Sequence, residues 1–360
     1  MSTYPGTFQK AILVKRKNRF VAEVSLNNAP LDVYVPNTGR LSELALPGAE
    51  VLLSPINSKY QYKILYIINR SFPVMIDSTY SNSLFYNLLK QKKVPGLENF
   101  SIIKREPEYG NHRFDFLIGN KKEELYIELK SCTLFYEKTG SFPDAVSSRA
   151  SEHVKALAET GKGKLIFLVL RNDIELFLPN YHTDFGFYET LKKHKNDIDI
   201  HAFTVQYDET LNIDSLKEIP VVIPDVTSKG VFLLVLFNAE DIVNSDGEVF
   251  EQGYYIYCGS DSKVFKTIGS IRAKNGLRKI FADEQFSNTK LISDLPVIST
   301  SVTVDDLKTE LICNGGSYVT FGDKGSTKTG KEPVYFKTNP AETQWFWDLI
   351  LKIRFDNYSR

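Results

Sequence analysis

The sequence predicts a mixed α+β protein made of three successive folded parts. Three observations predict this class. Short extended segments separated by turn residues fill the first hundred positions, strands alternate with amphipathic helices from about 101 to 220, and a connector containing two prolines precedes a further α/β stretch. At about 100–200 residues per domain, 360 residues allow two or three such parts. A hydrophobic fraction of 42% and a charged fraction of 24% exclude a disordered chain.

The first part, predicted over residues 1–85, has the pattern of a small antiparallel barrel. Asn, Pro and Gly turns separate extended segments at 19–24, 31–35, 49–54 and 60–68. A five-stranded OB-like barrel fits this length, and that fold often lays nucleic acid across one strand face. Residues 1–100 carry 12 basic and 6 acidic side chains, a net charge of +6 that agrees with a polyanionic partner. A barrel that only packs on its neighbour explains the pattern equally well.

The second part, predicted over residues 86–220, is a sheet covered by helices. A helix near 80–95 is expected to bridge it to the barrel. Strands are expected at 113–118, 124–130, 165–170 and 199–205, and helices at 147–160 and 185–195. Because the segment 165–170 is apolar throughout, both faces of the sheet should be buried.

The third part, predicted over residues 229–340, is a smaller α/β unit followed by a C-terminal helix at 341–360. Pro220 and Pro224 mark the connector that precedes it. Strands are expected at 230–237, 254–258, 297–303 and 334–336, with a helix near 268–281. The glycine-containing stretches at 315–316 and 322–331 are expected to be surface loops.

Cysteine usage and hydropathy argue against secretion and membrane insertion. The three cysteines are widely separated and form no CxxC pair, so neither a disulfide framework nor a zinc knuckle is indicated. The first twenty residues lack the apolar core of a signal peptide, and the longest apolar runs are too short to cross a bilayer. We therefore expect a cytoplasmic protein with no membrane partner.

Two of the predicted strands carry charged side chains that suit metal chemistry. Side chains alternate along a strand, so Glu128 and Lys130 share one face, and a hairpin through Gly119-Asn120 would bring Asp115 near Glu128. The two carboxylates would hold a hard divalent cation such as Mg²⁺ or Mn²⁺, and Lys130 would neutralise charge on a phosphate or position the nucleophile. Taken alone, this spacing is common by chance, and a structural ion pair on an edge strand is the simpler explanation.

The chain from about Lys15 to Ile219 resembles the sugar fermentation stimulation protein A (SfsA) family. Seven blocks carry the resemblance in the right order: RFVAEV at 19–24, VPNTGRL at 35–41, Pro47-Gly48, Ile76-Asp77-Ser78 with Asn82, YGN and RFDFL within 109–117, ELKS at 128–131, and FPDAV at 142–146 with Arg149 and His153. The resemblance implies an OB-fold followed by a PD-(D/E)xK nuclease-like domain, in a family described as binding DNA and linked to the control of sugar use.

Residue by residue, the resemblance implies a catalytic set. Asp115 and Glu128 would be the metal ligands and Lys130 the catalytic lysine, and Glu106 fits a further acidic position that is often supplied by the helix before the first core strand. His112 and Cys132 stand where the family usually has Ser and Val, and neither replaces a presumed ligand.

A basic set is predicted to contact the nucleic acid: Arg19, Arg40, Arg113, Arg149 and His153. Arg149 and His153 lie one helical turn apart on the same face, and arginine suits bidentate phosphate contacts. A cap followed by an ordinary helix surface is the alternative for this pair.

Residues 229–337 faintly resemble the GIY-YIG-like nuclease domains. The resemblance implies a weak second site made by Tyr255 or Tyr257, Arg272 and Glu310. The arginine is shifted by one position, which turns a helical side chain by about 100°, and the expected His-rich and Cys-rich segments are missing. A degenerate binding or packing module is therefore favoured over a second active nuclease.

Two functions of different classes follow. Intact Asp115, Glu128 and Lys130 favour a divalent-metal-dependent endonuclease, and the alternative is a non-specific DNA-binding regulatory protein of sugar metabolism without cleavage activity. DNA is favoured over RNA as the partner, and strandedness stays open. So does the oligomeric state, although a homodimer would make cutting two strands easier. A carbohydrate-processing enzyme has no support in the residues.

Overall fold

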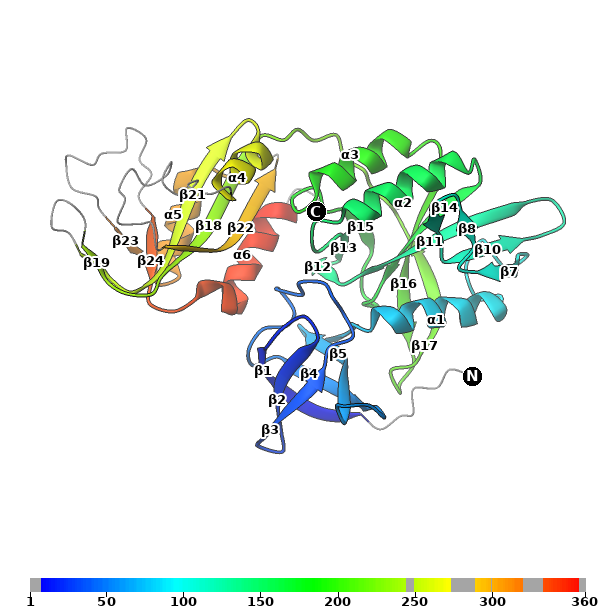
Figure 1. Ribbon diagram of the computed structural model, residues 1–360, viewed down its shortest axis with the longest axis horizontal. Coiled ribbons are helices and arrows are strands. Elements are labelled where there is room, and N and C mark those ends of the chain that lie inside the picture. Colours follow the sequence, from blue (N-terminus) through cyan, green and yellow to red (C-terminus); the bar gives the residue numbers. More distant parts are fainter. Residues whose placement is uncertain (1–7, 244–248, 273–288, 299, 320–332, 356–360) are drawn as a thin grey trace. The chain divides into compact units, whose positions relative to one another are not determined.

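The computed structural model describes residues 8–243, 249–272, 289–298, 300–319 and 333–355 (Figure 1). The chain divides into two compact units between Pro224 and Asp225, inside the predicted connector, and each unit is described separately. Across the described ranges, no helix is long and apolar enough to cross a membrane.

The first unit begins with a closed five-stranded barrel, as predicted. Strand order is β3-β2-β1-β4-β5, and a parallel bridge between Tyr34 of β3 and Lys63 of β5 closes it, while β6 extends the sheet beyond β5. Alternate side chains such as Leu13, Val24 and Val33 fill its interior. The strands are β1 (Gln9–Arg16), β2 (Val21–Leu26), β3 (Ala29–Tyr34), β4 (Glu50–Pro55), β5 (Tyr62–Asn69) and β6 (Phe72–Met75).

Strand β1 is the barrel element that the sequence pattern did not predict. Ala11 and Leu13 point into the barrel, but Ile12 and Val14 on the outer face are also apolar, 45% and 40% exposed. The alternation of polar and apolar residues that signals a half-buried strand is therefore hidden in this segment.

Helix α1 (Ser78–Lys90) joins the barrel to the second sheet. The side chain of Asp77 caps it by accepting from the amide of Tyr80. The predicted domain boundary at 85/86 falls inside this continuous helix. Leu84, Phe85 and Leu88 pack in one cluster with the second sheet, so the whole helix belongs with that sheet.

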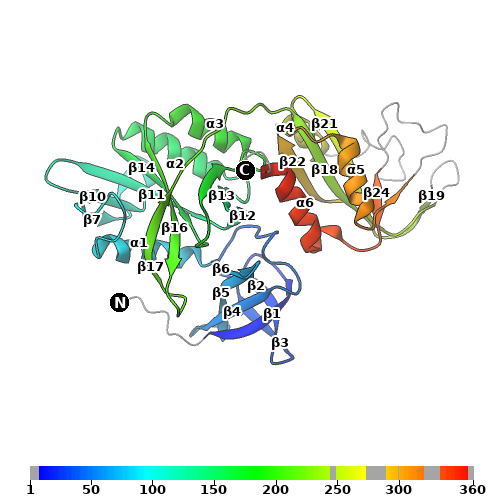
Figure 2. The ribbon, with the colours of Figure 1, turned by 180° about the vertical axis from the view of Figure 1, so that it is seen from behind.

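The second sheet has six strands in the order β17-β16-β14-β11-β10-β7. β11, β14 and β16 run parallel, and the outer pairings are antiparallel. Helices α2 (Ser148–Glu159) and α3 (Phe185–His194) cover one face and α1 covers the other (Figures 1 and 2). Every residue of β14 is buried, which confirms the predicted two-sided cover. The strands are β7 (Ser101–Arg105), β10 (Phe116–Gly119), β11 (Glu124–Cys132), β14 (Gly163–Val169), β16 (Asp199–Tyr207) and β17 (Ile213–Ile219).

The predicted strand at 113–118 is interrupted. It divides into β9 (His112–Arg113), which pairs only with β8 (Glu108–Tyr109), and β10. Phe114 lies between them and is buried in the core, with its amide bonded to the Pro107 carbonyl. This break places Asp115 immediately before β10. A further small sheet contains β12 (Leu134–Tyr136), β13 (Thr139–Phe142) and β15 (Leu176–Pro179).

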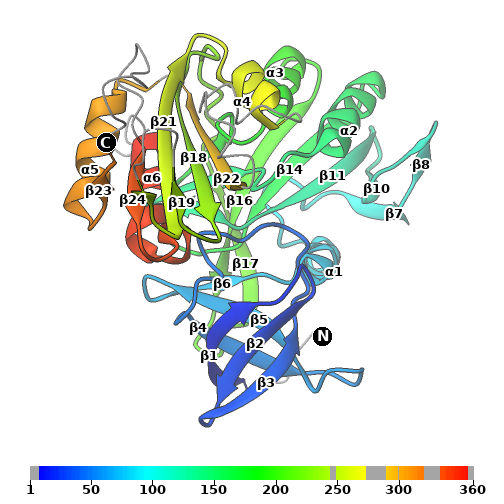
Figure 3. The ribbon, with the colours of Figure 1, turned by 60° about the vertical axis from the view of Figure 1, so that its left-hand side comes forward.

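The second unit is an antiparallel sheet with helices (Figure 3). Strand order is β22-β18-β21-β24-β23. The predicted strand at 297–303 was wrong, because β22 ends at Ile298 and Thr303 instead caps a helix in a capping box with Asp306. The predicted helix at 268–281 and the loop at 322–331 lie wholly or partly outside the described residues. The elements are β18 (Gly230–Asn238), β19 (Ile242–Val243), β20 (Val249–Phe250), β21 (Gly253–Asp261), α4 (Val264–Arg272), β22 (Lys290–Ile298), α5 (Val304–Cys313), β23 (Ser317–Tyr318), β24 (Val334–Phe336) and α6 (Gln344–Phe355).

Replacing Phe167 by alanine should strongly destabilise the first unit. Phe167 lies on β14, is fully buried, and stacks on Phe177 with ring centroids 4.1 Å apart. Loss of the ring should lower the free energy of unfolding by about 3–5 kcal/mol, because a cavity remains in a packed core. Urea unfolding followed by circular dichroism measures the change. Ile103→Ala, at a side chain 53% exposed, is the control, and equal losses in both variants would contradict the packing described here.

Candidate functional site

Asp115 and Glu128 come together because β10 and β11 pair in antiparallel register. Phe116 is the partner of Ile127, and one residue earlier the amide of Asp115 donates to the Ile127 carbonyl at 3.0 Å. Asp115 Oδ2 accepts from the amide of Leu129 at 2.7 Å. The Asp115 carboxylate is therefore held against β11 beside Glu128, as the hairpin prediction expected.

Helix α1 supplies a residue that the sequence analysis did not assign to the site. Asn82 Nδ2 donates to Asp115 Oδ1 at 2.7 Å, so both oxygens of that carboxylate have a donor. Asn82 was present in one of the seven matching blocks, but only as part of a resemblance. An amide on a helix face whose neighbours Ser81 and Phe85 are buried is the signal that could have identified it.

Glu128 is buried and lies between a lysine and a histidine. Lys130 Nζ and His153 Nδ1 are both 2.6 Å from Glu128 Oε1. Arg149 Nε donates to His153 Nε2 at 3.3 Å, so Nε2 is an acceptor and the ring hydrogen is on Nδ1, where Glu128 accepts it. Arg149 and His153 therefore reach the candidate site through Glu128.

The two carboxylates differ in their pKa values. Burial, together with the negative charge of Glu128, raises the pKa of Asp115 to about 6. Burial acts in the same direction on Glu128, but the hydrogen bond from His153 and the charge of Lys130 outweigh it and hold the pKa of that carboxyl below its usual value. Near neutral pH both carboxylates are therefore ionised, although both lie in a partly desolvated environment.

The donor set suits a small hard cation. Asp115 and Glu128 are both oxygen donors, and in the described part of the chain no group of three or more His, Cys, Asp and Glu residues is arranged for a metal. Mg²⁺ is commonly held by one or two carboxylates and keeps several of its waters, so two carboxylates are sufficient. A divalent cation would also offset the repulsion that raises the pKa of Asp115.

Glu106 is not brought into this group. It follows β7 directly instead of lying on a helix, and its side chain is 67% exposed and paired with Arg113 at 3.3 Å. Its link to the site is through the backbone, because its amide donates to the Asp115 carbonyl at 2.9 Å. The expectation that a helix places this carboxylate beside Asp115 was wrong, because a loop between two strands supplies the residue.

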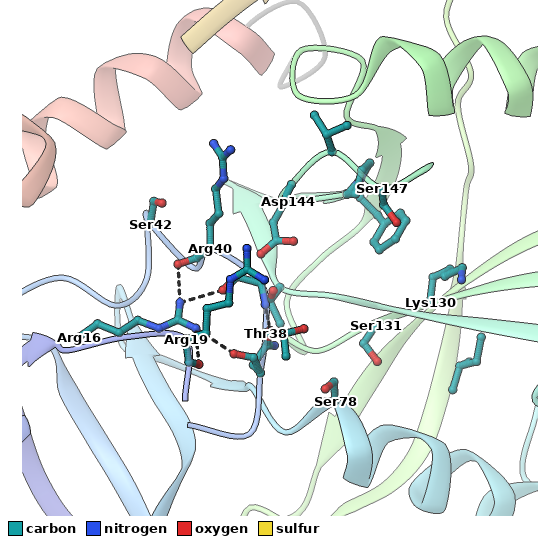
Figure 4. Close-up of a pocket in the computed structure, with 18 of the residues that line it drawn as sticks. Arg16, Arg19, Thr38, Arg40, Ser42, Ser78, Lys130, Ser131, Asp144 and Ser147 are labelled. Carbon is teal, nitrogen blue, oxygen red and sulfur yellow. Dashed lines mark hydrogen bonds between the residues drawn. The ribbon is translucent and has the colours of Figure 1, made fainter. Parts of the chain in front are cut away.

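A cavity of about 770 Å³ opens beside the carboxylates (Figure 4). Arg19 and Arg40 of the barrel line it, and Lys130 with Asn82 lines the part next to Glu128 and Asp115. The other lining residues are mainly small and polar: Arg16, Asn18, Asn37, Thr38, Gly39, Ser42, Ser78, Leu129, Ser131, Thr133, Phe142, Pro143, Asp144, Ala145, Val146 and Ser147. The structure thus places two of the predicted nucleic-acid contacts, Arg19 and Arg40, on the same cavity as the predicted catalytic lysine.

The Asp144 carboxylate and the barrel loop at Gly39 approach each other closely at one wall of the cavity. A Cβ atom at Gly39 would lie 2.2 Å from Asp144 Oδ2, so a larger residue there would have to displace the end of that side chain. The guanidinium of Arg16 donates to the carbonyls of Asn37, Gly39 and Arg40, which fixes the barrel loop beneath it.

The weak second site predicted in the second unit does not form a shared cluster. The hydroxyl of Tyr255 donates to the Glu251 carbonyl at 2.8 Å, and the Tyr257 ring lies 6.1 Å from that of Phe232. Arg272 forms a two-point ion pair with Asp294, and Glu310 is exposed on α5 beside a different cavity, of about 130 Å³. Each residue is held by its own neighbours, so the GIY-YIG-like assignment stays a prediction.

The fold and site define a class of protein in which an OB barrel precedes a mixed sheet that carries a half-buried carboxylate, a buried carboxylate and an adjacent lysine. Comparison with known families agrees: residues 14–76 match the SfsA N-terminal OB domain, and residues 79–210 match the sugar fermentation stimulation protein RE domain. The chain belongs to the SfsA family.

Relatives and a solved structure support this membership. A sugar fermentation stimulation protein homolog of Clostridium tetani is 36% identical over 225 residues, covering 60% of this chain and 97% of the relative. The homolog of Methanosphaera stadtmanae is 38% identical over 190 residues, 49% of this chain and 78% of the relative. The structure of Pyrococcus furiosus SfsA in complex with Ca²⁺ matches with a TM-score of 0.57 and 27% identity, covering 60% of this chain and 96% of that one.

Asp115→Asn should stabilise the metal-free protein above pH 6. The folded pKa of Asp115 is raised to about 6, so its contribution to stability is fully present below about pH 4 and is lost as pH rises through 6. At pH 7.5 in chelator, the variant should gain up to about 3 kcal/mol in unfolding free energy, with little gain at pH 4. Urea unfolding at both pH values measures this. Glu124→Gln, an exposed position on the same strand, should show no such pH-dependent gain, and an equal gain there would contradict the prediction.

Proposed function

We propose that this protein is a nucleic-acid-binding nuclease that cleaves phosphodiester bonds with a divalent metal ion, Mg²⁺ or Mn²⁺. The observation that carries the proposal is the adjacent pair of carboxylates, half-buried Asp115 and buried Glu128, with Lys130 bonded to Glu128 and lining the same cavity as Arg19 and Arg40. Ca²⁺ in the Pyrococcus furiosus SfsA complex supports a preference for hard divalent cations in this family. DNA is the favoured substrate, and the reaction is that of a PD-(D/E)xK endonuclease.

Each residue has a role that follows from its contacts. Asp115 and Glu128 would hold the metal, which when bound supplies Lewis-acid polarisation of the phosphodiester and a more acidic water. Asn82 orients Asp115, and His153 orients Glu128. Lys130 lines the cavity and offers a positive charge to the phosphate as negative charge develops.

The alternative function is a non-specific DNA-binding regulatory protein without cleavage, and one observation favours it. Glu128 already pairs with Lys130, and both oxygens of Asp115 have donors, so the site is well satisfied without a metal. In that case the charged cluster would stabilise the fold, and binding would depend on the basic residues of the barrel.

Cleavage assays separate the two functions. Labelled single- and double-stranded DNA and RNA are incubated with wild type, Glu128→Gln and Lys130→Ala in Mg²⁺, Mn²⁺ or chelator, and binding is recorded in the same samples. We expect metal-dependent cleavage that falls by at least about 100-fold in both variants while binding survives, because charge stabilisation in the transition state is lost.

The matched control is Glu124→Gln, which removes a carboxylate from the exposed end of β11. It should cleave at the wild-type rate. Binding without metal-dependent cleavage of any substrate would contradict the nuclease proposal and favour the regulatory alternative.

His153 should tune metal affinity as a positioning residue. His153→Leu removes the donor that holds Glu128 Oε1 and should weaken Mn²⁺ binding by about 10–100-fold, as loss of a ligand's hydrogen-bond partner commonly does. Titration calorimetry on the protein alone measures the affinity. His153→Gln, which keeps an amide donor, should lose less, and His194→Leu at a surface pair with Asp197 is the control. Unchanged Mn²⁺ affinity in His153→Leu would show that Glu128 needs no such support.

A further inference from the structure

We propose that Arg149 is a positioning residue for the metal site and not a phosphate contact. It holds His153 in the orientation that supports Glu128, and in this way it strengthens metal binding. This inference rests on the proposed function, because Glu128 is one of the two carboxylates that would hold the metal. The effect passes through a single imidazole ring, since Arg149 Nε donates to one nitrogen of His153 and Glu128 accepts from the other.

The three side chains form a line that runs from solvent to a buried oxygen. Arg149 and His153 lie four residues apart on α2, so their side chains share one face of the helix. Arg149 is exposed, whereas 8% of the His153 side chain and 5% of the Glu128 side chain are accessible. The contacts are 3.3 Å from Arg149 Nε to His153 Nε2 and 2.6 Å from His153 Nδ1 to Glu128 Oε1. A restraint at the surface is therefore carried to a carboxylate in the interior.

The direction of the hydrogen bonds makes an arginine suitable for this role. A guanidinium only donates, so it fixes His153 Nε2 as the acceptor and leaves the ring hydrogen on Nδ1, facing Glu128. Both neighbours of the ring thus favour the same arrangement. A ring turned by 180° about its bond to Cβ would present carbon atoms to both partners, and both hydrogen bonds would be lost.

The aromatic neighbours of His153 do not select this orientation by themselves. The rings of Phe114 and His112 lie 6.2 Å and 5.9 Å from the His153 ring, at interplanar angles of 82° and 86°. Such contacts depend on the plane of the ring, and a turn of 180° keeps that plane. The two hydrogen bonds therefore decide which ring nitrogen faces Glu128.

The position of Arg149 separates it from the arginines that would meet a phosphate. Arg19 and Arg40 line the cavity of about 770 Å³, whereas the lining contributed by the start of α2 ends at Ser147, its N-cap. Arg149 is not among the described residues that line this cavity. Its one assigned contact is with the residue that supports Glu128.

The charge of Arg149 gives the test its sign. A positive charge near a metal site repels the cation, so removal of a charge that has no other role should leave metal binding unchanged or make it slightly tighter. Removal of a residue that holds His153 should instead weaken metal binding. The two explanations therefore predict opposite changes.

The first measurement is titration calorimetry with Mn²⁺ on the full chain without nucleic acid. Arg149→Met should weaken Mn²⁺ binding by about 3–10-fold, less than His153→Leu, because Glu128 keeps a hydrogen-bond partner. Arg149→Lys, which keeps a donor and the charge, should recover part of this loss. Lys155→Met is the matched control, since it removes the same charge from an exposed position on the other side of α2, and it should not weaken binding. Melting temperatures confirm that the variants are folded.

A double-mutant cycle tests the route of the effect. In a His153→Leu background, Arg149→Met should cause no further weakening of Mn²⁺ binding, because the ring through which it acts is gone. In chelator, Arg149→Met should lose no more affinity for labelled DNA than Lys155→Met does, as measured by fluorescence anisotropy. Additive losses of Mn²⁺ affinity, unchanged Mn²⁺ binding in Arg149→Met, or a selective loss of DNA affinity in that variant would each overturn the inference.

A readout without metal distinguishes failure of this inference from failure of the proposed function. In NMR spectra recorded in chelator, the Nδ1 hydrogen of His153 should exchange with water at least about tenfold faster in Arg149→Met than in wild type or Lys155→Met, because the ring is held from one side only. Equal exchange rates would overturn the inference even in a protein that binds Mn²⁺ and cleaves DNA. A wild-type protein that binds no Mn²⁺ would contradict the proposed function and the metal part of this inference, and the exchange rates would still decide whether Arg149 holds the ring.

Discussion

The placement of a half-buried carboxylate beside a buried one is the constraint on which the first unit depends. Asp115 and Glu128 repel each other in a place with little solvent, and leaving either without partners would cost several kcal/mol. Their partners come from separate elements: Asn82 from α1, the Leu129 amide from β11 and His153 from α2. Since α1 and α2 lie on opposite faces of the sheet, the layers must be packed correctly before the site is satisfied. The site is therefore complete only when the helices on both faces have packed against the sheet.

The barrel is held against the second sheet by a similar set of polar contacts, several of which involve backbone carbonyl groups. The Asp144 carboxylate lies against Gly39, Arg16 donates to carbonyls of the barrel loop, and Asn37 donates to the Ile76 carbonyl just before α1. These contacts pair polar groups that would otherwise lack a hydrogen-bond partner. Because hydrogen bonds are directional, they hold the barrel in one position against the second sheet. Contacts that hold the barrel loop in place also fix the positions of Arg19 and Arg40, which line the same cavity as Lys130.

The sequence could predict what depends on local patterns. Alternation and turn residues predicted most strands of the barrel, the apolar segment at 165–170 predicted a sheet buried on both faces, and the Gly119-Asn120 turn placed Asp115 near Glu128. The failures have long-range causes. Asn82 bonds a residue 33 positions away, and the break at Phe114 is stabilised by packing in the core. Thr303 and Asp306 form a capping box, a local signal three residues apart that conflicts with the strand predicted over 297–303.

Charge is divided between the two halves of the first unit, and under the proposed function this division would separate binding of the nucleic acid from its cleavage. Residues 1–100 carry a net +6, whereas residues 101–220 carry 16 basic and 20 acidic side chains, a net −4. In the second part, His153 is bonded to Glu128, Arg149 Nε donates to His153, and Arg113 is paired with Glu106. Under the proposed function, Arg19 and Arg40 of the barrel would therefore supply attraction for a polyanion beside Lys130, which lines the same cavity. A substitution on either half should therefore change one property and spare the other, which a site built from a single domain would not allow.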